Sequence, residues 1–160
     1  MRMSMMALLI AVVLSVSAFA QSKSVEGVWS ITEVTTTGTG GATKQASQPS
    51  MYLFTKKHYS IIYVSSDAAR SATADSSKMT AEELRSVFVD SFIANAGTYE
   101  LKAGKLTVHP MVAKSPSYMQ PGVFTTWSVK IDGNMMTMVS ESSNTGPSTN
   151  PATFKLKRVE

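Results

Sequence analysis

The sequence predicts an all-β protein in which eight antiparallel strands close into an up-and-down β-barrel, with one short α-helix inserted among them. Eight runs of residues are rich in β-branched and aromatic side chains and alternate apolar with polar positions. Most of these runs follow one another across short turns. A single helix could not cover an open sheet of this size, whereas closure removes both exposed edges. A two-sheet sandwich is the alternative fold.

The chain begins with the pattern of a secretory signal peptide. One cation, Arg2, precedes an apolar run over residues 5–16, and a small-residue A-x-A cleavage pattern ends at Ala20. The apolar run is shorter than the ~20 residues that a membrane-spanning helix needs. We therefore predict a signal peptide over residues 1–20, export to the periplasm or the extracellular medium, and a mature domain 21–160 without a transmembrane segment. An uncleaved N-terminal anchor is the alternative.

The composition narrows the possible functions of this domain, whose length is typical of one domain with its own hydrophobic core. The chain contains no cysteine, which excludes disulfides, thiolate catalysis and Cys-based metal sites. The formal net charge is +4, and the cations are scattered rather than gathered into a basic stripe with interleaved aromatic residues. We therefore expect no nucleic-acid partner, and we expect a monomer.

Three strands are predicted before the helix. Residues 25–36 alternate β-branched and polar side chains, and residues 51–55 and 58–65 are apolar and aromatic runs joined as a hairpin. The stretches 38–50 and 66–78 are rich in small and polar residues and show no periodicity. We predict that these two stretches are loops that gate the open end of the barrel.

One helix is predicted over residues 81–94. The preceding sequence Thr80-Ala81-Glu82-Glu83 is a capping box, in which the threonine hydroxyl and the glutamate carboxylate reciprocally accept hydrogen bonds from backbone N–H groups. Apolar residues then recur at helical spacing, at Leu84, Val87, Phe88 and Phe92. The helix is expected to end near residues 95–97, where asparagine and glycine occur.

The alternation of period two returns after the helix. The strands predicted there cover residues 98–102, 105–112, 123–131, 135–141 and 152–159. Two of the connections are hairpin turns, Ala103-Gly104 and Asp132-Gly133-Asn134, and Asp-Gly between alternating runs is the strongest short-range hairpin signal. A polar loop with two prolines, residues 142–151, precedes the last strand.

The two ends of the mature domain carry residues that fit together. Gly27-Val28-Trp29 opens the first strand, and Arg158 shares one face of the last strand with Phe154 and Leu156. An up-and-down barrel closes by pairing its first and last strands, which would place the arginine over the indole ring. A cation in this position gains roughly 0.5 to 2 kcal/mol. We predict that Gly27, Trp29 and Arg158 form the closed end of the barrel.

These elements resemble the bacterial lipocalin-like domain proteins. In that family G-x-W opens the first strand, a helical segment interrupts the strand order and a G-T-Y-E strand follows. In this chain the corresponding segments are Gly27-Val28-Trp29, the helix predicted over residues 81–94, and Gly97-Thr98-Tyr99-Glu100. In the wider lipocalin group a basic residue of the last strand packs over the motif tryptophan, and Arg158 is the matching position. The resemblance implies a calyx that binds a small, largely apolar molecule. The chain departs from the secreted eukaryotic lipocalins in having no disulfides.

Aromatic and methionine residues are the candidates to line such a calyx, because small-molecule sites are mostly apolar with a few oriented polar groups. Parity along the strands selects tyrosines and a tryptophan on single faces, and methionine adapts to irregular ligands. The predicted ligand-binding residues are Tyr59, Tyr63, Tyr99, Trp127, Met111, Glu33 and His109. The alternative is a filled barrel, in which the same residues form a solid core.

Glu33 and His109 are included as the candidate proton-transfer groups. Glu33 shares the parity of Trp29 and Ile31, so strict alternation would point its carboxylate into the barrel, where an unpaired charge is costly. We favour instead a bend or bulge in the first strand that lets Glu33 reach solvent. A metal would need His58, His109 and an acid to face inward together. We predict no catalytic residue, no metal and no cofactor.

The sequence therefore predicts an exported protein that carries or sequesters a small hydrophobic molecule. One alternative is an isomerase or hydrolase of an apolar substrate that uses Glu33 or His109 for proton transfer. The other is a structural envelope protein whose barrel interior is filled.

Overall fold

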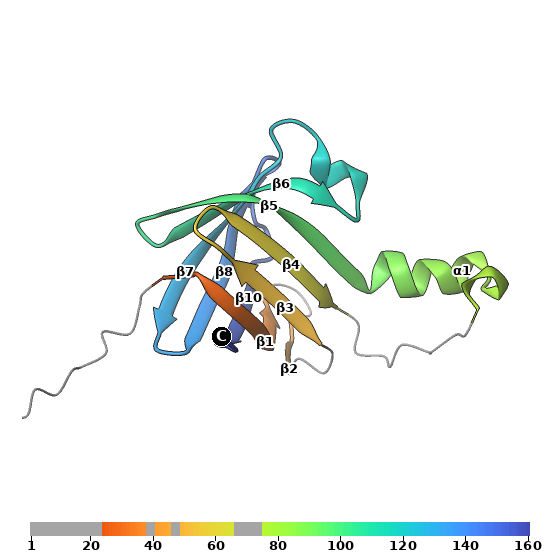
Figure 1. The fold of residues 1–160 in the computed structure, drawn as a ribbon, viewed down its shortest axis with the longest axis horizontal. Coiled ribbons are helices and arrows are strands. Elements are labelled where there is room, and N and C mark those ends of the chain that lie inside the picture. The colour runs from red at the N-terminus through yellow and green to blue at the C-terminus, as the bar shows by residue number, and fades with distance from the viewer. Residues whose placement is uncertain (1–23, 38–40, 46–48, 66–74) are drawn as a thin grey trace, which may run out of the picture.

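The computed structural model describes residues 24–37, 41–45, 49–65 and 75–160. In these residues antiparallel strands form a closed barrel, and a short helical segment projects away from it (Figure 1). The predicted signal peptide and part of each predicted gating loop lie outside the described residues.

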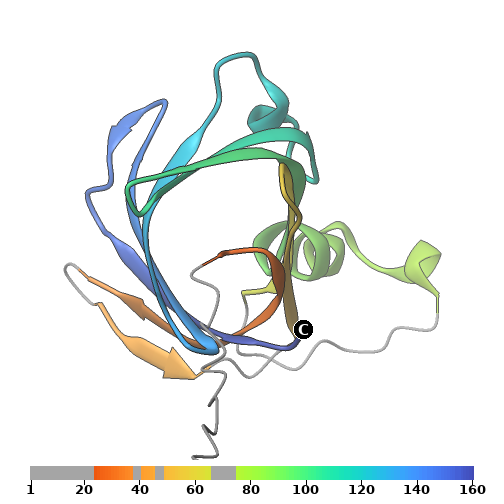
Figure 2. The same ribbon diagram turned by 60° about the vertical axis from the view of Figure 1, so that its left-hand side comes forward.

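Eight strands form the wall of the barrel, and they pair in the order of the chain. They are β1 (Gly27–Thr36), β3 (Ser50–Phe54), β4 (His58–Val64), β5 (Phe92–Lys102), β6 (Lys105–Ala113), β7 (Thr125–Asp132), β8 (Met135–Ser143) and β10 (Ala152–Arg158). The last strand, β10, pairs antiparallel with both β8 and β1, so the wall closes on itself. Figure 2 shows the strands arranged as a ring. The predicted up-and-down barrel is confirmed, and the sandwich is not formed.

The remaining elements are short. Two further strands, β2 (Thr43–Gln45) and β9 (Gly146–Pro147), pair with β1 and β8 within stretches predicted to be loops. The helical elements are η1 (Ser76–Lys78), α1 (Ala81–Leu84), η2 (Arg85–Asp90), which is a π-helix, and η3 (Pro116–Met119). None of the residues of α1 and η2 is buried.

The helical segment begins as predicted and ends early. The Thr80 hydroxyl accepts a hydrogen bond from the backbone N–H of Glu83, whose carboxylate accepts one from the Thr80 N–H at 2.7 Å, so the capping box is present. The predicted end at residue 94 is wrong, because Ser91 follows the helix and Phe92 begins β5. Phe92 lies opposite Val64 in β4, and this cross-strand pairing outweighs the helical spacing of its side chain.

The barrel has two unlike ends because antiparallel strands alternate in direction. We call the end where β1 begins and β10 finishes the closed end. Three tight turns lie there, and they join β3 to β4, β5 to β6 and β7 to β8. The longer connections, including residues 114–124 and 144–151, lie at the opposite, open end. Inward-facing side chains form one core between the two ends: Val25, Trp29, Ile31, Tyr52, Phe54, Tyr59, Ile61, Leu106, Val108, Met136, Met138, Phe154 and Leu156.

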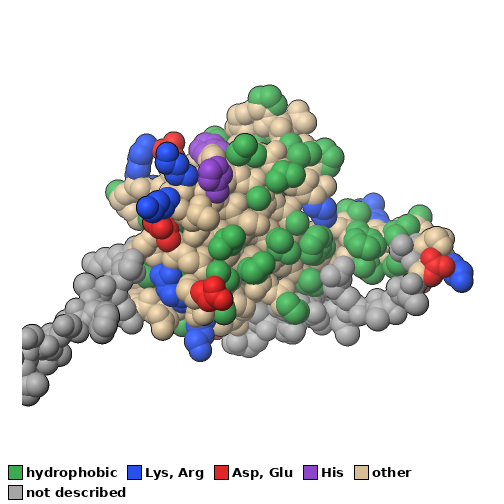
Figure 3. All heavy atoms as spheres, viewed as in Figure 1, with side chains coloured by type: hydrophobic (Ala, Val, Ile, Leu, Met, Phe, Trp, Pro, Cys, Tyr) green, Lys and Arg blue, Asp and Glu red, His purple; other side chains and the backbone are tan. Residues whose placement is uncertain are grey.

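The outer wall also carries apolar surface. Ile62 of β4 and Val112 of β6 face outward and are exposed, and together with Ala94 and Ala96 of β5 they line a shallow groove of about 180 Å³. Figure 3 shows hydrophobic side chains on this side of the barrel and on the helical segment. The groove is separate from the barrel interior, because residues next to these in sequence, such as Ile61, face the core.

Candidate functional site

The closed end of the barrel is sealed by Trp29 and Arg158. The guanidinium carbon lies 4.0 Å from the centroid of the indole ring, and Trp29 is 0% exposed. The indole N–H donates to the carbonyl of Val25 at 2.8 Å. Arg158 donates to the carbonyl oxygen of Ser24 at 2.9 Å and to that of Glu26. These bonds hold the segment before β1 against the end of the barrel.

Gly27 is required at this end by close packing. Its backbone has a φ of +124°, a conformation that side chains with a Cβ rarely adopt. A Cβ there would lie 2.5 Å from both Nη1 of Arg158 and the carbonyl oxygen of Glu160. The three residues predicted for the closed end therefore meet at one place in the structure.

Four aromatic rings meet inside the barrel toward the open end; we call them the aromatic cluster, which consists of Tyr52, Tyr63, Trp127 and Phe154. Trp127 and Tyr63 pack edge-on against Phe154, with centroids 5.4 and 5.9 Å apart. Tyr52 stacks on Tyr63 at 6.0 Å. Tyr52 and Phe154 are buried, whereas Tyr63 and Trp127 pack against the core and are only half-buried.

The tyrosines of the aromatic cluster stay protonated at neutral pH. Burial raises the pKa of Tyr63 to about 12, and Tyr118 of the loop between β6 and β7 adds to the rise. Burial, with a smaller contribution from Tyr63, raises the pKa of Tyr52 well above its usual value. Both phenols are therefore O–H donors as well as acceptors.

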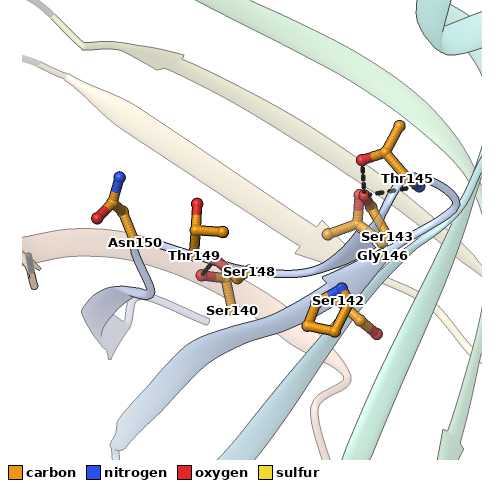
Figure 4. Close-up of a pocket in the computed structure, with 10 residues that line it drawn as sticks. Ser140, Ser142, Ser143, Thr145, Gly146, Ser148, Thr149 and Asn150 are labelled. Carbon is orange, nitrogen blue, oxygen red and sulfur yellow. Dashed lines mark hydrogen bonds between the residues drawn. The ribbon is translucent and has the colours of Figure 1, made fainter.

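A cavity of about 320 Å³ lies at the open end (Figure 4). We call it the hydroxyl cavity. Its lining residues are Thr125, Ser140, Ser142, Ser143, Thr145, Gly146, Pro147, Ser148, Thr149 and Asn150. None of these residues is charged. No ring of the aromatic cluster lines the cavity, but Ser140 of its wall lies directly opposite Trp127 in the pairing of β7 with β8.

The structure places two other predicted tyrosines away from this site. Tyr59 is 2% exposed, and its hydroxyl is the one buried side-chain polar atom of the described residues that lacks a hydrogen-bond partner. Tyr99 packs edge-on against Phe54 at 5.5 Å and donates its hydroxyl to the carbonyl of Thr55 at 2.6 Å. Because Thr55 lies in the turn after β3, Tyr99 belongs to the closed end.

Glu33 lies on the outside of the barrel because β1 contains a bulge. The register of β1 against β10 shifts between Ile31 and Glu33, which reverses the parity of the strand beyond that point. The Glu33 carboxylate pairs with Nζ of Lys155 at 2.7 Å, and its side chain is 19% exposed. The favoured sequence interpretation, a bulge that brings Glu33 toward solvent, therefore describes its position, and the structure does not bring Glu33 to the aromatic cluster.

A second bulge decides the position of Met111. The register of β5 against β6 shifts between Ala96 and Gly97, so Met111 has no partner in this pair of strands and is 67% exposed. His109 is half-buried, and its ring lies 6.4 Å from that of Phe124. Neither side chain contacts the rings of the aromatic cluster through any ring interaction in the described part of the chain.

Tyr52, Phe154 and the hydroxyl cavity are not among the site residues predicted from the sequence. Parity could have found the first two, since Tyr52 alternates with Phe54 and Phe154 shares a face with Arg158. Nothing in the sequence distinguishes the serines and threonines of the hydroxyl cavity from those of an ordinary polar loop.

Comparison of the chain with protein-family models, with curated proteins and with solved structures finds no match. In the part of the chain that the structure describes, no three His, Cys, Asp or Glu side chains are grouped so that they could hold a metal ion. No helix within the same residues has the length and apolar character needed to cross a membrane. The fold and the site define a closed eight-stranded barrel with one sealed end and half-buried aromatic rings toward the other.

Proposed function

We propose that this protein is an exported, lipocalin-like binding protein that takes up a small, largely apolar molecule at the aromatic cluster. The observation that carries the proposal is the contrast between Trp29, which is fully buried, and Trp127 and Tyr63, which pack against the core and are only partly buried. Covering such surface with an apolar ligand is favourable by roughly 25 cal/mol per Å². Aromatic walls with a few polar groups are typical of small-molecule sites.

The neighbouring side chains support an uncharged ligand body. Phe154 and Tyr52 contribute further rings to the cluster, and the hydroxyls of Tyr52 and Tyr63, whose pKa values burial raises above the ordinary value, carry no charge at neutral pH. A charged ligand body would lose its hydration there without gaining an ion pair. The signal-peptide pattern of residues 1–20 supports release of the mature domain to the periplasm or the extracellular medium. One chain closes the barrel by itself, which supports a monomeric binding unit.

A structural protein with a filled barrel is the second candidate. The buried side chains from Trp29 to Phe154 form a continuous core, which favours a solid interior. An enzyme that uses Glu33 is less favoured, because the Glu33 carboxylate pairs with Lys155 on the outer wall.

Titration with a neutral apolar fluorophore, N-phenyl-1-naphthylamine, tests the proposal. We expect saturable binding with one site per chain, and we expect Trp127→Ala to weaken it about tenfold or more because the larger of the two half-buried rings is lost. Lys102→Ala is the control, since Lys102 is exposed beside the β5–β6 turn at the closed end and pairs with Glu100. Absence of saturable binding across this fluorophore and a panel of lipids and apolar metabolites would support the filled barrel instead.

A further inference from the structure

We infer that the ligand is an amphiphile whose neutral, hydroxyl-rich head group binds in the hydroxyl cavity while its apolar body lies on the aromatic cluster. This inference rests on the proposed function and adds the chemical class of the ligand. Four steps support it: the free hydrogen-bonding groups of the cavity, its fixed walls, its lack of charge and its position beside Trp127.

The hydroxyl cavity holds polar side chains that make no hydrogen bond to other described residues. Its side-chain hydrogen bonds join Ser140 to Ser148 at 3.4 Å and Ser143 to Thr145 at 2.8 Å, as Figure 4 shows. Four further lining side chains make no hydrogen bond to any described residue: Thr125, Ser142, Thr149 and Asn150. Each hydroxyl can donate one hydrogen bond and accept others, and the amide can do both as well. These groups match a ligand that itself offers both donors and acceptors.

The walls of the hydroxyl cavity are held in place by hydrogen bonds to the backbone. The hydroxyl of Ser140 accepts from the N–H of Ala152 at 2.8 Å, and the N–H of Ser148 donates to the carbonyl of Glu141 at 2.8 Å. At the turn, the hydroxyl of Ser143 accepts from the N–H of Thr145 at 3.2 Å. A site whose walls are fixed before binding loses less conformational entropy when a ligand enters.

The absence of charge in the hydroxyl cavity selects the kind of head group. None of its lining residues carries a charge, and the nearby carboxylate of Glu141 is engaged with Nζ of Lys105 at 2.8 Å. An anionic or cationic head group would give up hydration without a counter-charge. A neutral head group with several hydroxyls exchanges its hydrogen bonds with water for hydrogen bonds with the cavity. The cavity volume of about 320 Å³ is within the usual range of small-molecule sites.

The position of the cavity explains why one molecule would use both regions. Ser140 is the cross-strand partner of Trp127, and Thr125 precedes Trp127 by two positions on β7. Two residues along a strand span about 7 Å, and cross-strand partners are closer. A head group joined to an apolar body on Trp127 therefore has to reach only one residue pair along the sheet to meet Ser140 and Thr125 of the cavity wall.

Isothermal titration with amphiphiles that share one octyl chain tests this inference on the mature domain, at concentrations below micelle formation. The probes are octyl glucoside with a neutral polyhydroxyl head, octyl sulfate, octyltrimethylammonium and 1-octanol. We expect octyl glucoside to bind about tenfold more tightly than either charged probe. We also expect the double variant Thr149→Val with Asn150→Leu to weaken octyl glucoside about tenfold and to leave 1-octanol unchanged. Thr137→Val, on the outer face of β8 beside Met136, is the matched control and should change neither.

The possible outcomes separate this inference from the proposed function. Binding of all four probes with equal affinity, or tightest binding of a charged probe, would overturn the head-group assignment and leave apolar binding in place. The same conclusion follows if the double variant folds, as judged by its circular dichroism, and binds octyl glucoside like the parent chain. Failure of every probe to bind would overturn both the assignment and the proposed function.

Discussion

At the closed end of the barrel an arginine covers a fully buried tryptophan, whereas at the open end a tryptophan and a tyrosine are only half-buried. The polar groups differ in the same way. Arg158 and the indole N–H of Trp29 donate to backbone carbonyls, whereas the hydroxyls of Thr125, Ser142 and Thr149 in the hydroxyl cavity make no hydrogen bond to described residues. The same strands thus form one end whose side chains stabilise the fold and another end whose polar side chains are available to bind a ligand. Mutations should separate the two properties.

The largest effect is expected from Trp29→Ala. Removing this side chain deletes a fully buried ring and leaves the Arg158 guanidinium without its stacking partner. We expect a loss of about 3 to 5 kcal/mol in the free energy of unfolding, measured by urea denaturation. Trp127→Ala should cause a clearly smaller loss, because Trp127 is only partly buried. Equal losses of unfolding free energy in the two variants would contradict the claim that only the closed end is fully packed.

Gly27→Ala should have the next largest effect on stability. Its positive φ is unfavourable for alanine, and the new methyl group would collide with Arg158 and with the Glu160 carbonyl. Gly146→Ala is a matched control, since Gly146 has a φ of +114° and nothing within 4 Å of the new Cβ. We expect about 2 kcal/mol more destabilisation at Gly27 than at Gly146 in parallel thermal melts. A smaller or reversed difference would show that the closed end is loosely packed.

Arg158→Met keeps an apolar stem over the indole and removes the charge and the hydrogen bonds to Ser24 and Glu26. We expect a loss of about 1 to 2 kcal/mol in unfolding free energy and no change in fluorophore affinity. Lys157→Met, at an exposed neighbouring position of β10, should leave both quantities unchanged. A loss of affinity in Arg158→Met would place the binding site at the wrong end.

Stability should fall at alkaline pH because of the buried tyrosines of the aromatic cluster. Tyr63 has a pKa of about 12 in the folded chain and about 10 when unfolded. Between these pH values the unfolded chain binds fewer protons than the folded chain, so the free energy of unfolding decreases as the pH rises. We expect Tyr63→Phe to flatten this decrease in urea titrations at several pH values. An unchanged slope would indicate that the Tyr63 hydroxyl is not buried in the folded protein.

The smallest effect is expected from Glu33→Gln, on the outer wall between the two ends. Its partner Lys155 is half-exposed, and exposed ion pairs contribute about 1 kcal/mol or less. We expect a change of that size in unfolding free energy, with unaltered ligand affinity. A large loss of ligand affinity would instead indicate that Glu33 takes part in ligand binding.

The fold could be predicted because its signals are local. Asp132-Gly133-Asn134 and Ala103-Gly104 form the turns that their sequences predict, and alternation identifies each strand of the wall. The helix end was wrong because Phe92 satisfies helical spacing and strand pairing equally well in the sequence. Only its partner in β4, Val64, decides between the two structures, and that partner is far away in the chain.

The candidate site could be predicted only in part. Alternation places Tyr63 on the inward face of β4 with Ile61, and Trp127 on the inward face of β7 with Val129, although the register of β7 against β8 shifts just before Trp127. Alternation fails at Met111, where a bulge in the pairing of β5 with β6 turns the side chain outward. This bulge accompanies a very close approach of strands, since a Cβ at Gly97 would lie 2.0 Å from the carbonyl oxygen of His109. Such contacts depend on tertiary packing, and no sequence period reports them.

The most direct test of a binding end and a sealed end follows the two tryptophan side chains, which are the only two in the sequence. In a ¹H–¹⁵N correlation spectrum each indole N–H gives one signal, assigned by Trp127→Phe. During titration with N-phenyl-1-naphthylamine, we expect the Trp127 signal to shift and saturate while the Trp29 signal stays in place. A saturable shift of the Trp29 signal, with Trp127 unmoved, would contradict the account.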